Sequence, residues 1–414
     1  MKRVVITGVG AITPIGNTIQ AYTEGLQNGK SGAASITKFD ASRFKTQFAC
    51  EVKGFDVEEH IHRREVRRMD PFSHLAMVSV AEAVEMSGLD FDNFDLDRGG
   101  VIWASGIGGF DTLETEISRE ALNEGDPRYN PFLIPKLIID IASGLISMKY
   151  GLRGVNYGVV SACASSTHAI SLAFDNIRLG RADIIISGGS EAAICKTGIG
   201  GFGAMKALSR RNDDPATASR PFDADREGFV LGEGAGALIL ESYEHAKARG
   251  ANILVEVMGG GATADAYHMT APHPEGIGAM NVMKNAVNES GLNLDDVDYV
   301  NVHGTSTPLG DKAEVKAIQK LFGDHAYKLN ISSTKSMTGH LLGAAGAIEA
   351  IACIIAINNN FVPPTINHFT DDPDIDNKLN FTFNQAQQRK IKYALSNTFG
   401  FGGHNASILF KRFA

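Results

Sequence analysis

The chain has 414 residues, of which 43% are hydrophobic and 21% are charged, and its formal net charge is -8. This composition supplies enough apolar material for a large core and excludes a disordered protein. The negative charge argues against a general nucleic-acid binder, because such proteins usually need a basic surface to neutralise phosphates.

The N-terminal residues predict a first strand rather than a targeting signal. Residues 1–8 carry the positive charge of a signal peptide but lack its apolar length, and Pro14 and Gly16 follow closely. The cysteines are far apart and form no CxxC pair, so we expect neither a zinc site nor a disulfide framework. A reduced, cytoplasmic setting fits this pattern best. The four are Cys50, Cys163, Cys195 and Cys353.

Three further segments predict an α/β protein without a membrane span. Residues 100–104 and 183–187 are short apolar runs followed by glycine, as buried strands usually are. Between them, residues 110–148 have helical composition and predict an insertion used for oligomer contacts or as a substrate-channel wall. Residues 341–357 form a long apolar stretch that carries Glu349, and we expect a helix buried in the core.

Two internal echoes predict a duplicated α/β unit. Residues 5–17 resemble residues 300–311, since both are apolar runs that end in Thr-Pro-aliphatic-Gly. Residues 228–240 resemble residues 400–410, since both are glycine-rich approaches to a strand. The helices that open near Cys163 and near His340 would then be counterparts. We expect two halves, residues 1–250 and 251–414, with a boundary near residues 249–250.

Cys163 lies where a strand-like run meets a helix-like run. Small and capping residues surround it between residues 161 and 166, which predicts a position at a helix N-terminus. There the helix dipole and the free amides favour a thiolate. An isolated cysteine among small residues is more often an inert core residue, so the nucleophile hypothesis depends on its surroundings. Cys353 is predicted to sit mid-helix and to serve only packing.

Two histidines offer the partners that a thiol nucleophile needs. His303 follows a strand-like run and His340 precedes the apolar helix, although either could simply cap a turn. Both fall at strand ends or helix starts, where open α/β sheets collect ligands. The duplication would bring Cys163 and both histidines to one central crevice. Lys335 lies within one turn of His340 and is either a solvated lysine or a buried charge partner.

Four segments, taken together and in this order, carry a specific resemblance. They are the Cys163 segment and residues 303–308, 335–340 and 397–403. With them the chain resembles the elongating β-ketoacyl-acyl-carrier-protein synthases of the thiolase superfamily over essentially its whole length, and the synthase II group most closely. The resemblance implies a five-layered αβαβα fold with two mixed sheets around buried helices. It also implies a homodimer, no cofactor, and an acidic acyl carrier protein as the partner.

The implied reaction is a decarboxylating Claisen condensation in fatty acid biosynthesis. An acyl group held on Cys163 is joined to malonyl-acyl-carrier protein, which gives a 3-oxoacyl-acyl-carrier protein two carbons longer. The backbone N–H groups of Cys163 and Phe401 would hold the tetrahedral oxyanion. Neutral His303 and His340 would donate N–H bonds to the enolate. Lys335 would support the histidines electrostatically, with Glu349 as its partner.

The resemblance also implies roles around this centre. Phe401 would gate the acyl pocket, and Ile107 would act in it as a movable plug that limits chain length. No metal is required, although four positions match residues that hold a structural cation in relatives. The further implied positions are Phe202 in the acyl pocket; Thr270, Thr305 and Thr307 at the pantetheine arm; Arg63, Arg64, Arg67, Arg68 and Lys206 at a carrier-protein docking patch; and Asn301, Glu349, Ser396 and Asn397 at the cation site.

Two positions depart from the family pattern, and several alternatives remain. Val302 stands where alanine is frequent, and His404 stands where threonine is frequent, which leaves the gating less determined. A ketosynthase of a specialised polyketide-type pathway and a non-catalytic chain-length partner are the alternatives, although the partner would lack Cys163. A degradative thiolase would need a second cysteine, and none follows Cys353. An initiating synthase would carry asparagine in place of His340.

Overall fold

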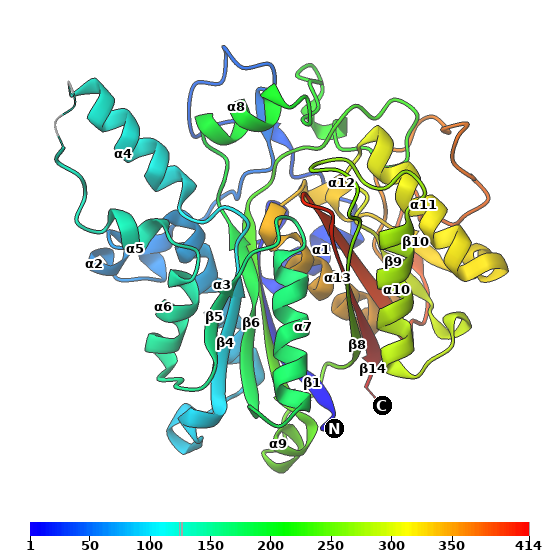
Figure 1. Ribbon diagram of the computed structural model, residues 1–414, viewed down its shortest axis with the longest axis horizontal. Coiled ribbons are helices and arrows are strands. Elements are labelled where there is room, and N and C mark those ends of the chain that lie inside the picture. The colour runs from blue at the N-terminus through cyan, green and yellow to red at the C-terminus, as the bar shows by residue number, and fades with distance from the viewer. Residues whose placement is uncertain (124, 126, 414) are drawn as a thin grey trace.

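The computed structural model describes residues 1–123, 125 and 127–413, so the last residue of the second predicted half lies outside it (Figure 1). Its main sheet has ten strands with helices packed around it. In spatial order the strands are β10 (Asn330–Ser332), β9 (Tyr299–Asn301), β13 (Tyr393–Gly400), β14 (His404–Arg412), β8 (Val255–Ala264), β1 (Val4–Ile12), β7 (Gly234–Ser242), β6 (Ile184–Glu191), β4 (Gly99–Ala104) and β5 (Asn156–Val159). The runs predicted at residues 100–104 and 183–187 are β4 and β6.

The sheet consists of two five-stranded halves with the same strand order. One half reads β1-β7-β6-β4-β5 and the other reads β8-β14-β13-β9-β10. Strands β7 and β14 hold equivalent places, which agrees with the echo between residues 228–240 and 400–410. The echo of residues 5–17 in residues 300–311 was wrong as a sign of equivalence, because the counterpart of β1 is β8. The shared Thr-Pro-aliphatic-Gly motif reflects similar local turn chemistry at the end of a strand.

The two halves are hydrogen-bonded to each other, so the two predicted mixed sheets join into one. Strand β1 pairs antiparallel with β8 over three residue pairs, from Val4 opposite Val257 to Ile6 opposite Val255. This short pairing satisfies backbone groups that would otherwise remain free at the inner edge of each half. The main sheet is therefore continuous, and its halves act as the two β layers of the fold.

Helices form the remaining three layers of the predicted αβαβα arrangement. Helices α7 (Ser165–Arg178) and α13 (Ala345–Asn359) contact each other and strands of both halves, so they form the central layer. Helices α3 (Pro71–Ser87) and α6 (Ile141–Tyr150) cover the N-terminal half, and α10 (Ile277–Ser290) and α11 (Pro308–Phe322) cover the C-terminal half. Figure 1 shows α7 beside β6 and α13 between the halves.

Helix α13 is the buried helix that the apolar stretch predicted. All of its residues from Ala345 to Ile357 are buried. The span Leu342–Asn359 is long and apolar enough to cross a membrane, but 89% of it is buried inside the protein, so it packs as a core helix. A Cβ atom at Gly346 would collide with Thr167 of α7, which shows how closely the two central helices approach.

The remaining α-helices and β-strands lie around the halves and in the connection between them. Helix α9 ends at Ala248 and β8 begins at Val255, so the predicted boundary falls in the connection between the halves, and we propose the division at residue 250 on that basis. Helices α4 and α5 belong to the predicted insertion, and α4 projects from the body in Figure 1. These elements are α1 (Ile19–Gln27), α2 (Arg63–Val66), α4 (Phe110–Leu122), α5 (Leu133–Leu137), α8 (Lys196–Ala204), α9 (Tyr243–Ala248), α12 (Lys335–Thr338), β2 (Ala34–Ser35) paired with β3 (Phe48–Ala49), and β11 (Phe361–Val362) paired with β12 (Gln387–Gln388).

Candidate active site

A tight turn holds Cys163 between β5 and α7. Ala162 adopts a positive φ of 50°, an uncommon conformation for a residue other than glycine. The turn is closed by a hydrogen bond of 2.8 Å from the backbone N–H of Ser161 to Oγ of Ser165. Cys163 therefore precedes the first turn of α7, with only 8% of its surface exposed, and it lines a cavity of about 330 Å³.

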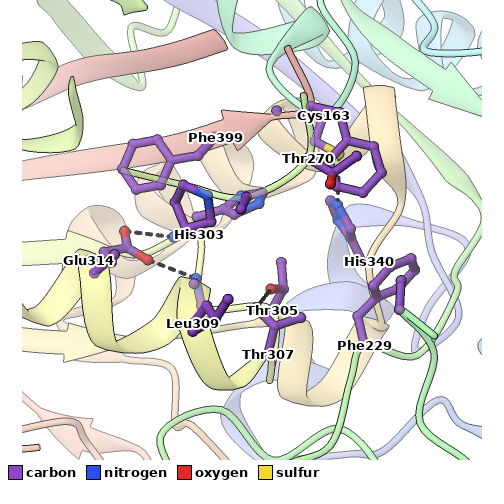
Figure 2. A pocket seen from close by; sticks show the side chains of 18 of the residues that line it. Cys163, Phe229, Thr270, His303, Thr305, Thr307, Leu309, Glu314, His340 and Phe399 are labelled. Carbon is purple, nitrogen blue, oxygen red and sulfur yellow. Dashed lines mark hydrogen bonds between the residues drawn. The ribbon is translucent and has the colours of Figure 1, made fainter. Parts of the chain in front are cut away.

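Two histidines from the C-terminal half meet this cysteine in the same cavity. The Nε2 atom of His340 lies 3.0 Å from Sγ of Cys163. The ring of His303 lies beside that of His340, with 5.2 Å between centroids and nearly perpendicular planes. Figure 2 shows both rings and the sulfur converging from different elements. The thiol and both imidazoles can therefore act on one bound thioester.

Burial dominates the electrostatics of Cys163. It raises the pKa of the thiol to about 12, although the Lys335 ammonium and a hydrogen bond from the backbone of Phe401 lower it. Burial therefore opposes the thiolate that a position at a helix N-terminus favours. The resting group is a thiol beside a neutral imidazole, and its proton must leave as the sulfur attacks.

Both histidines are held in the neutral form. Burial lowers the pKa of His303 and of His340 well below the ordinary value of 6.5, and the positive charge of Lys335 lowers both further. The Nδ1 atoms of both rings have no hydrogen-bond partner within the described part of the chain. Each ring thus has one N–H to donate and one nitrogen to accept a proton.

Nuclear magnetic resonance of ¹³C-labelled histidine can test this protonation state. A lowered pKa keeps an imidazole uncharged as the pH falls through 6.5, so we expect the signals of His303 and His340 to titrate only well below that value. Spectra of His303→Ala and His340→Ala assign the two signals. Lys335→Met should move both midpoints upward, because it removes a nearby positive charge. A midpoint of either ring near 6.5 in the unmodified protein would contradict the assignment.

Lys335 lies at the start of α12 and forms a buried ion pair with Glu349 of α13. Only 1% of the lysine surface is exposed and none of the glutamate surface. Of the two interpretations left open, the structure therefore shows the buried charge partner. Burial raises the pKa of Glu349 to about 7 despite the lysine, which indicates a carboxylate that depends on its partner.

Removing one member of this pair is expected to destabilise the protein. Lys335→Met should lower the free energy of unfolding by about 3 kcal/mol, because it leaves a buried carboxyl unpaired. Removing the lysine raises the pKa of Glu349 further, so the loss should grow as the pH rises above about 7, where the carboxyl ionises in the unmodified protein but stays protonated in the variant. The double variant Lys335→Met with Glu349→Gln should recover most of the loss. Chemical denaturation at several pH values checks this, and equal stability of the single variant and the unmodified protein would refute it.

Most of the predicted substrate residues line the cavity. Thr305 and Thr307 follow β9, and their Oγ1 atoms lie 3.0 Å apart. Ile107 differs, because it lies outside the cavity lining and packs in the apolar cluster that contains Cys163 and Phe202. The role of Ile107 as a movable plug of the acyl pocket stays a prediction. The predicted positions in the lining are Phe202, Lys206, Thr270, Thr305, Thr307 and Phe401.

The predicted docking residues separate into two groups. Lys206 lines the cavity. Arg63, Arg64, Arg67 and Arg68 lie on α2 and just after it, and the guanidinium of Arg68 sits over the ring of Phe132 at 5.4 Å. In Figure 1, α2 lies at the left beside α5, whereas α10 and α11, which flank the cavity, lie at the right. Of the predicted docking residues on the described chain, the four arginines do not line the cavity.

Two family models identify the kind of protein to which this cysteine and these histidines belong. The N-terminal domain of beta-ketoacyl synthases matches residues 1–246, and the C-terminal domain of the same enzymes matches residues 254–369. The chain belongs to the beta-ketoacyl synthase family. The first match contains the Cys163 turn, and the second contains both His303 and His340.

Individual members of the beta-ketoacyl synthase family resemble the whole chain. A curated 3-oxoacyl-acyl-carrier-protein synthase 2 of Staphylococcus aureus (strain N315) is 49% identical over 412 residues, which cover 100% of this chain and 99% of that one. Among solved structures, the ishigamide ketosynthase/chain length factor is 34% identical with a TM-score of 0.94. A type II polyketide ketosynthase solved in complex with its acyl-carrier protein is 33% identical with a TM-score of 0.90. Both structural matches cover 100% of each chain.

In this beta-ketoacyl synthase, three of the four predicted cation positions carry buried oxygen atoms without a hydrogen-bond partner in the described part of the chain. Oδ1 of Asn301, Oγ of Ser396 and Oε2 of Glu349 are buried and lack a hydrogen-bond partner among residues 1–123, 125 and 127–413, whereas Oε1 of Glu349 is paired with Lys335. Such oxygen atoms suit a hard cation. The side chain of Asn397 instead bonds to Ser407 and Glu314. Three of the four residues therefore fit a cation, and elemental analysis of the protein and of Asn301→Leu tests that fit.

Sequence reasoning missed two buried carboxylates that shape the site of this beta-ketoacyl synthase. Glu314 of α11 accepts bonds of 2.9 and 2.8 Å from the backbone N–H groups of His303 and Gly304, and so holds the turn after β9 (Figure 2). Glu191 at the end of β6 accepts bonds from the backbone N–H groups of Ile107 and Gly343, at 3.1 and 2.9 Å. The sequence did offer a signal for both carboxylates: Glu314 lies on the apolar face of a helix, and Glu191 ends an apolar strand.

Two aromatic rings were also missed. Phe229 packs edge-on against the His340 ring at 5.4 Å, and Phe399 lies 5.6 Å from the His303 ring. Both line the cavity, and Figure 2 shows them on either side of the histidines. Their rings keep water from the imidazoles, which is one source of the lowered histidine pKa values.

Proposed function

We propose that the protein is an elongating 3-oxoacyl-acyl-carrier-protein synthase of fatty acid biosynthesis. It joins an acyl group carried on Cys163 to the two-carbon unit of malonyl-acyl-carrier protein and releases carbon dioxide. The observation that carries the proposal is the 3.0 Å contact between Sγ of Cys163 and Nε2 of His340, with His303 beside it in one cavity. Its identity of 49% to a curated synthase 2 over the full length supports the same reaction.

The first half-reaction transfers the acyl group to the protein. Cys163 attacks the acyl thioester as its S–H proton passes to Nε2 of His340, which is positioned to accept it. The backbone N–H groups of Cys163 and Phe401 donate hydrogen bonds to the tetrahedral oxyanion. The proton then passes to the departing carrier thiolate, which leaves as a free thiol. This route avoids a standing thiolate, in agreement with the raised pKa of Cys163.

The second half-reaction makes the new carbon–carbon bond. His303 and His340 donate N–H bonds to the thioester oxygen of the malonyl group, which stabilises the enolate as carbon dioxide leaves. For this step the neutral His340 ring takes the tautomer with its proton on Nε2 instead of Nδ1. The enolate carbon attacks the acyl carbonyl on Cys163, and the Cys163 thiolate departs and takes up a proton from solvent. Neutral rings suit this task. Each can donate an N–H group in the buried cavity, where a charged imidazolium would lose its favourable hydration. The chemistry uses no cofactor.

A stepwise mass-spectrometric assay tests the whole proposal. The purified protein is incubated with acyl-carrier proteins of graded chain length and then with malonyl-carrier protein. We expect an acyl adduct on Cys163 after the first addition and a 3-oxoacyl-carrier protein two carbons longer after the second. An adduct that is extended repeatedly would instead identify the polyketide-type alternative, and no adduct at any chain length would refute the mechanism.

The acyl carrier protein is the proposed partner, and the ketosynthase structure solved with its own acyl-carrier protein supports this choice. We expect Arg67→Glu combined with Arg68→Glu to raise the Michaelis constant for carrier-linked substrates about tenfold, because an acidic partner loses two favourable charges. Small acyl thioesters should react at the unchanged rate. Steady-state kinetics with both substrate types checks this, and an equal effect on both would show that the arginines act on the fold.

We further propose a homodimer formed through β5. This strand ends the main sheet, so no strand among the described residues pairs with its outer edge. Val160 and Tyr157 are exposed beside it, at 57% and 38%, and Leu122 of the insertion is 83% exposed. An edge paired with its own copy around a two-fold axis would cover these groups. Sedimentation of the protein and of Val160→Glu tests this, since the variant should shift toward monomer.

Four free cysteines agree with a cytoplasmic location.

A further inference from the structure

The loop between β13 and β14, residues 401–403, supplies one of the two proposed oxyanion donors. The backbone of Phe401 hydrogen-bonds Cys163, and Gly400 packs so closely that a Cβ atom there would lie 2.8 Å from the carbonyl oxygen of Ser161 and 3.0 Å from the backbone N of Cys163. The distance between the two donors therefore depends on how this loop is held against the Cys163 turn.

Both strands that flank the loop are tied to the same turn of α7. On one side, Oγ1 of Thr398 in β13 donates to Oγ1 of Thr167 at 2.8 Å. On the other side, the imidazole of His168 hydrogen-bonds the backbone of Asn405 in β14. Thr167 and His168 are neighbours in the first turn of α7, just after the nucleophile. The first turn of α7 is thus hydrogen-bonded to the strands at both ends of the loop.

His168 is also joined to the nucleophile turn itself. Its Nδ1 atom lies 2.7 Å from Oγ of Ser161, a buried hydroxyl two residues before Cys163. Burial lowers the pKa of His168, and His404 lowers it further, so the ring is neutral and presents one donor and one acceptor. A neutral imidazole can bridge a hydroxyl on one side and a backbone group on the other. The mechanism proposed above assigns no role to this pair.

We propose that Ser161 and His168 are positioning residues that hold the backbone N–H of Phe401 in register with the backbone N–H of Cys163. The chain of contacts runs from the Cys163 turn through Ser161 and His168 to Asn405 at the base of the loop. It touches neither the histidines that stabilise the enolate nor their ion-paired lysine. The pair therefore acts on acyl transfer and leaves decarboxylation to His303 and His340. This inference rests on the proposed function.

The two half-reactions separate this role from a general effect on the fold. In single-turnover experiments with acyl-carrier protein, His168→Ala and Ser161→Ala should each acylate Cys163 about tenfold more slowly, because a displaced donor stabilises the oxyanion less well. Carbon dioxide release from malonyl-carrier protein should stay within about twofold of the unmodified rate. Ser161→Ala keeps the ring and removes only a hydroxyl, so it remains informative if His168→Ala folds poorly.

A matched control removes a comparable histidine elsewhere. His325 is half-buried, its ring bonds to the carbonyl oxygen of Val297 at 2.8 Å, and it lies outside the cavity lining. His325→Ala should leave both half-reactions unchanged. Equal losses in both half-reactions, or normal acylation in Ser161→Ala, would overturn the inference while the proposed function stands. Absence of acylation in the unmodified protein would instead refute the proposed function.

Discussion

Cys163→Ala is expected to abolish acyl transfer, with the condensation rate falling by at least about a thousandfold. The variant lacks the sulfur that carries the acyl group between the two half-reactions. Its cavity and both histidines should remain, because the change removes one buried atom. Mass spectrometry should therefore find no acyl adduct on the variant after incubation with acyl-carrier protein.

Cys353→Ala is the matched control for this experiment. Cys353 is also fully buried, but it lies in the middle of α13, and its sulfur is 4.0 Å from the carbonyl oxygen of Leu395. We expect this variant to acylate and condense at the unmodified rate, with a small loss of stability. An adduct that persists in Cys163→Ala would move the nucleophile elsewhere and contradict the proposed mechanism.

The two histidine variants are expected to differ from each other. His303→Ala and His340→Ala should each slow decarboxylation about a hundredfold, because each removes one donor to the enolate oxygen. Acylation should separate them. Only His340 contacts the sulfur, at 3.0 Å, so His340→Ala should also slow acyl transfer, whereas His303→Ala should leave it nearly unchanged. Radiolabelled carbon dioxide release and adduct formation measure the two steps independently.

A conservative variant sharpens this comparison. Asparagine offers one N–H donor without an imidazole, so His303→Asn should recover part of the decarboxylation rate lost in His303→Ala. His340→Asn should likewise recover part of the decarboxylation rate but should not recover acyl transfer, because in that step the side chain must take a proton from Cys163 and an amide is a poor base. Decarboxylation that survives at full rate when both histidines are replaced by alanine would refute their role.

Local patterns predicted much of this fold. The small and capping residues around Cys163 indicated a helix start, and α7 begins at Ser165. The apolar stretch after His340 indicated a buried helix, and α13 is that helix. By contrast, the Thr-Pro-aliphatic-Gly echo misled, because a turn motif of a few residues recurs wherever a strand ends. The family resemblance, which depends on four segments in order, was the more reliable guide to the architecture.

Local sequence patterns did not predict the protonation state of Cys163. Position at a helix N-terminus predicted a thiolate at Cys163, yet burial raises the pKa of this thiol to about 12. A sequence shows the residues that precede a helix but not how much water reaches them. The same limit hid Glu314 and Glu191, whose partners are backbone groups of other segments.

The sequence by itself determined the family, the elements that carry Cys163, His303 and His340, and the chemistry that those side chains can perform. These properties depend on residue types and on neighbours within a few positions. Only the tertiary structure decided the 3.0 Å contact between sulfur and imidazole, the neutral state of both rings, and the hold of one turn of α7 on the loop that bears Phe401. Each of these arises from distances and desolvation between segments that lie far apart in the chain.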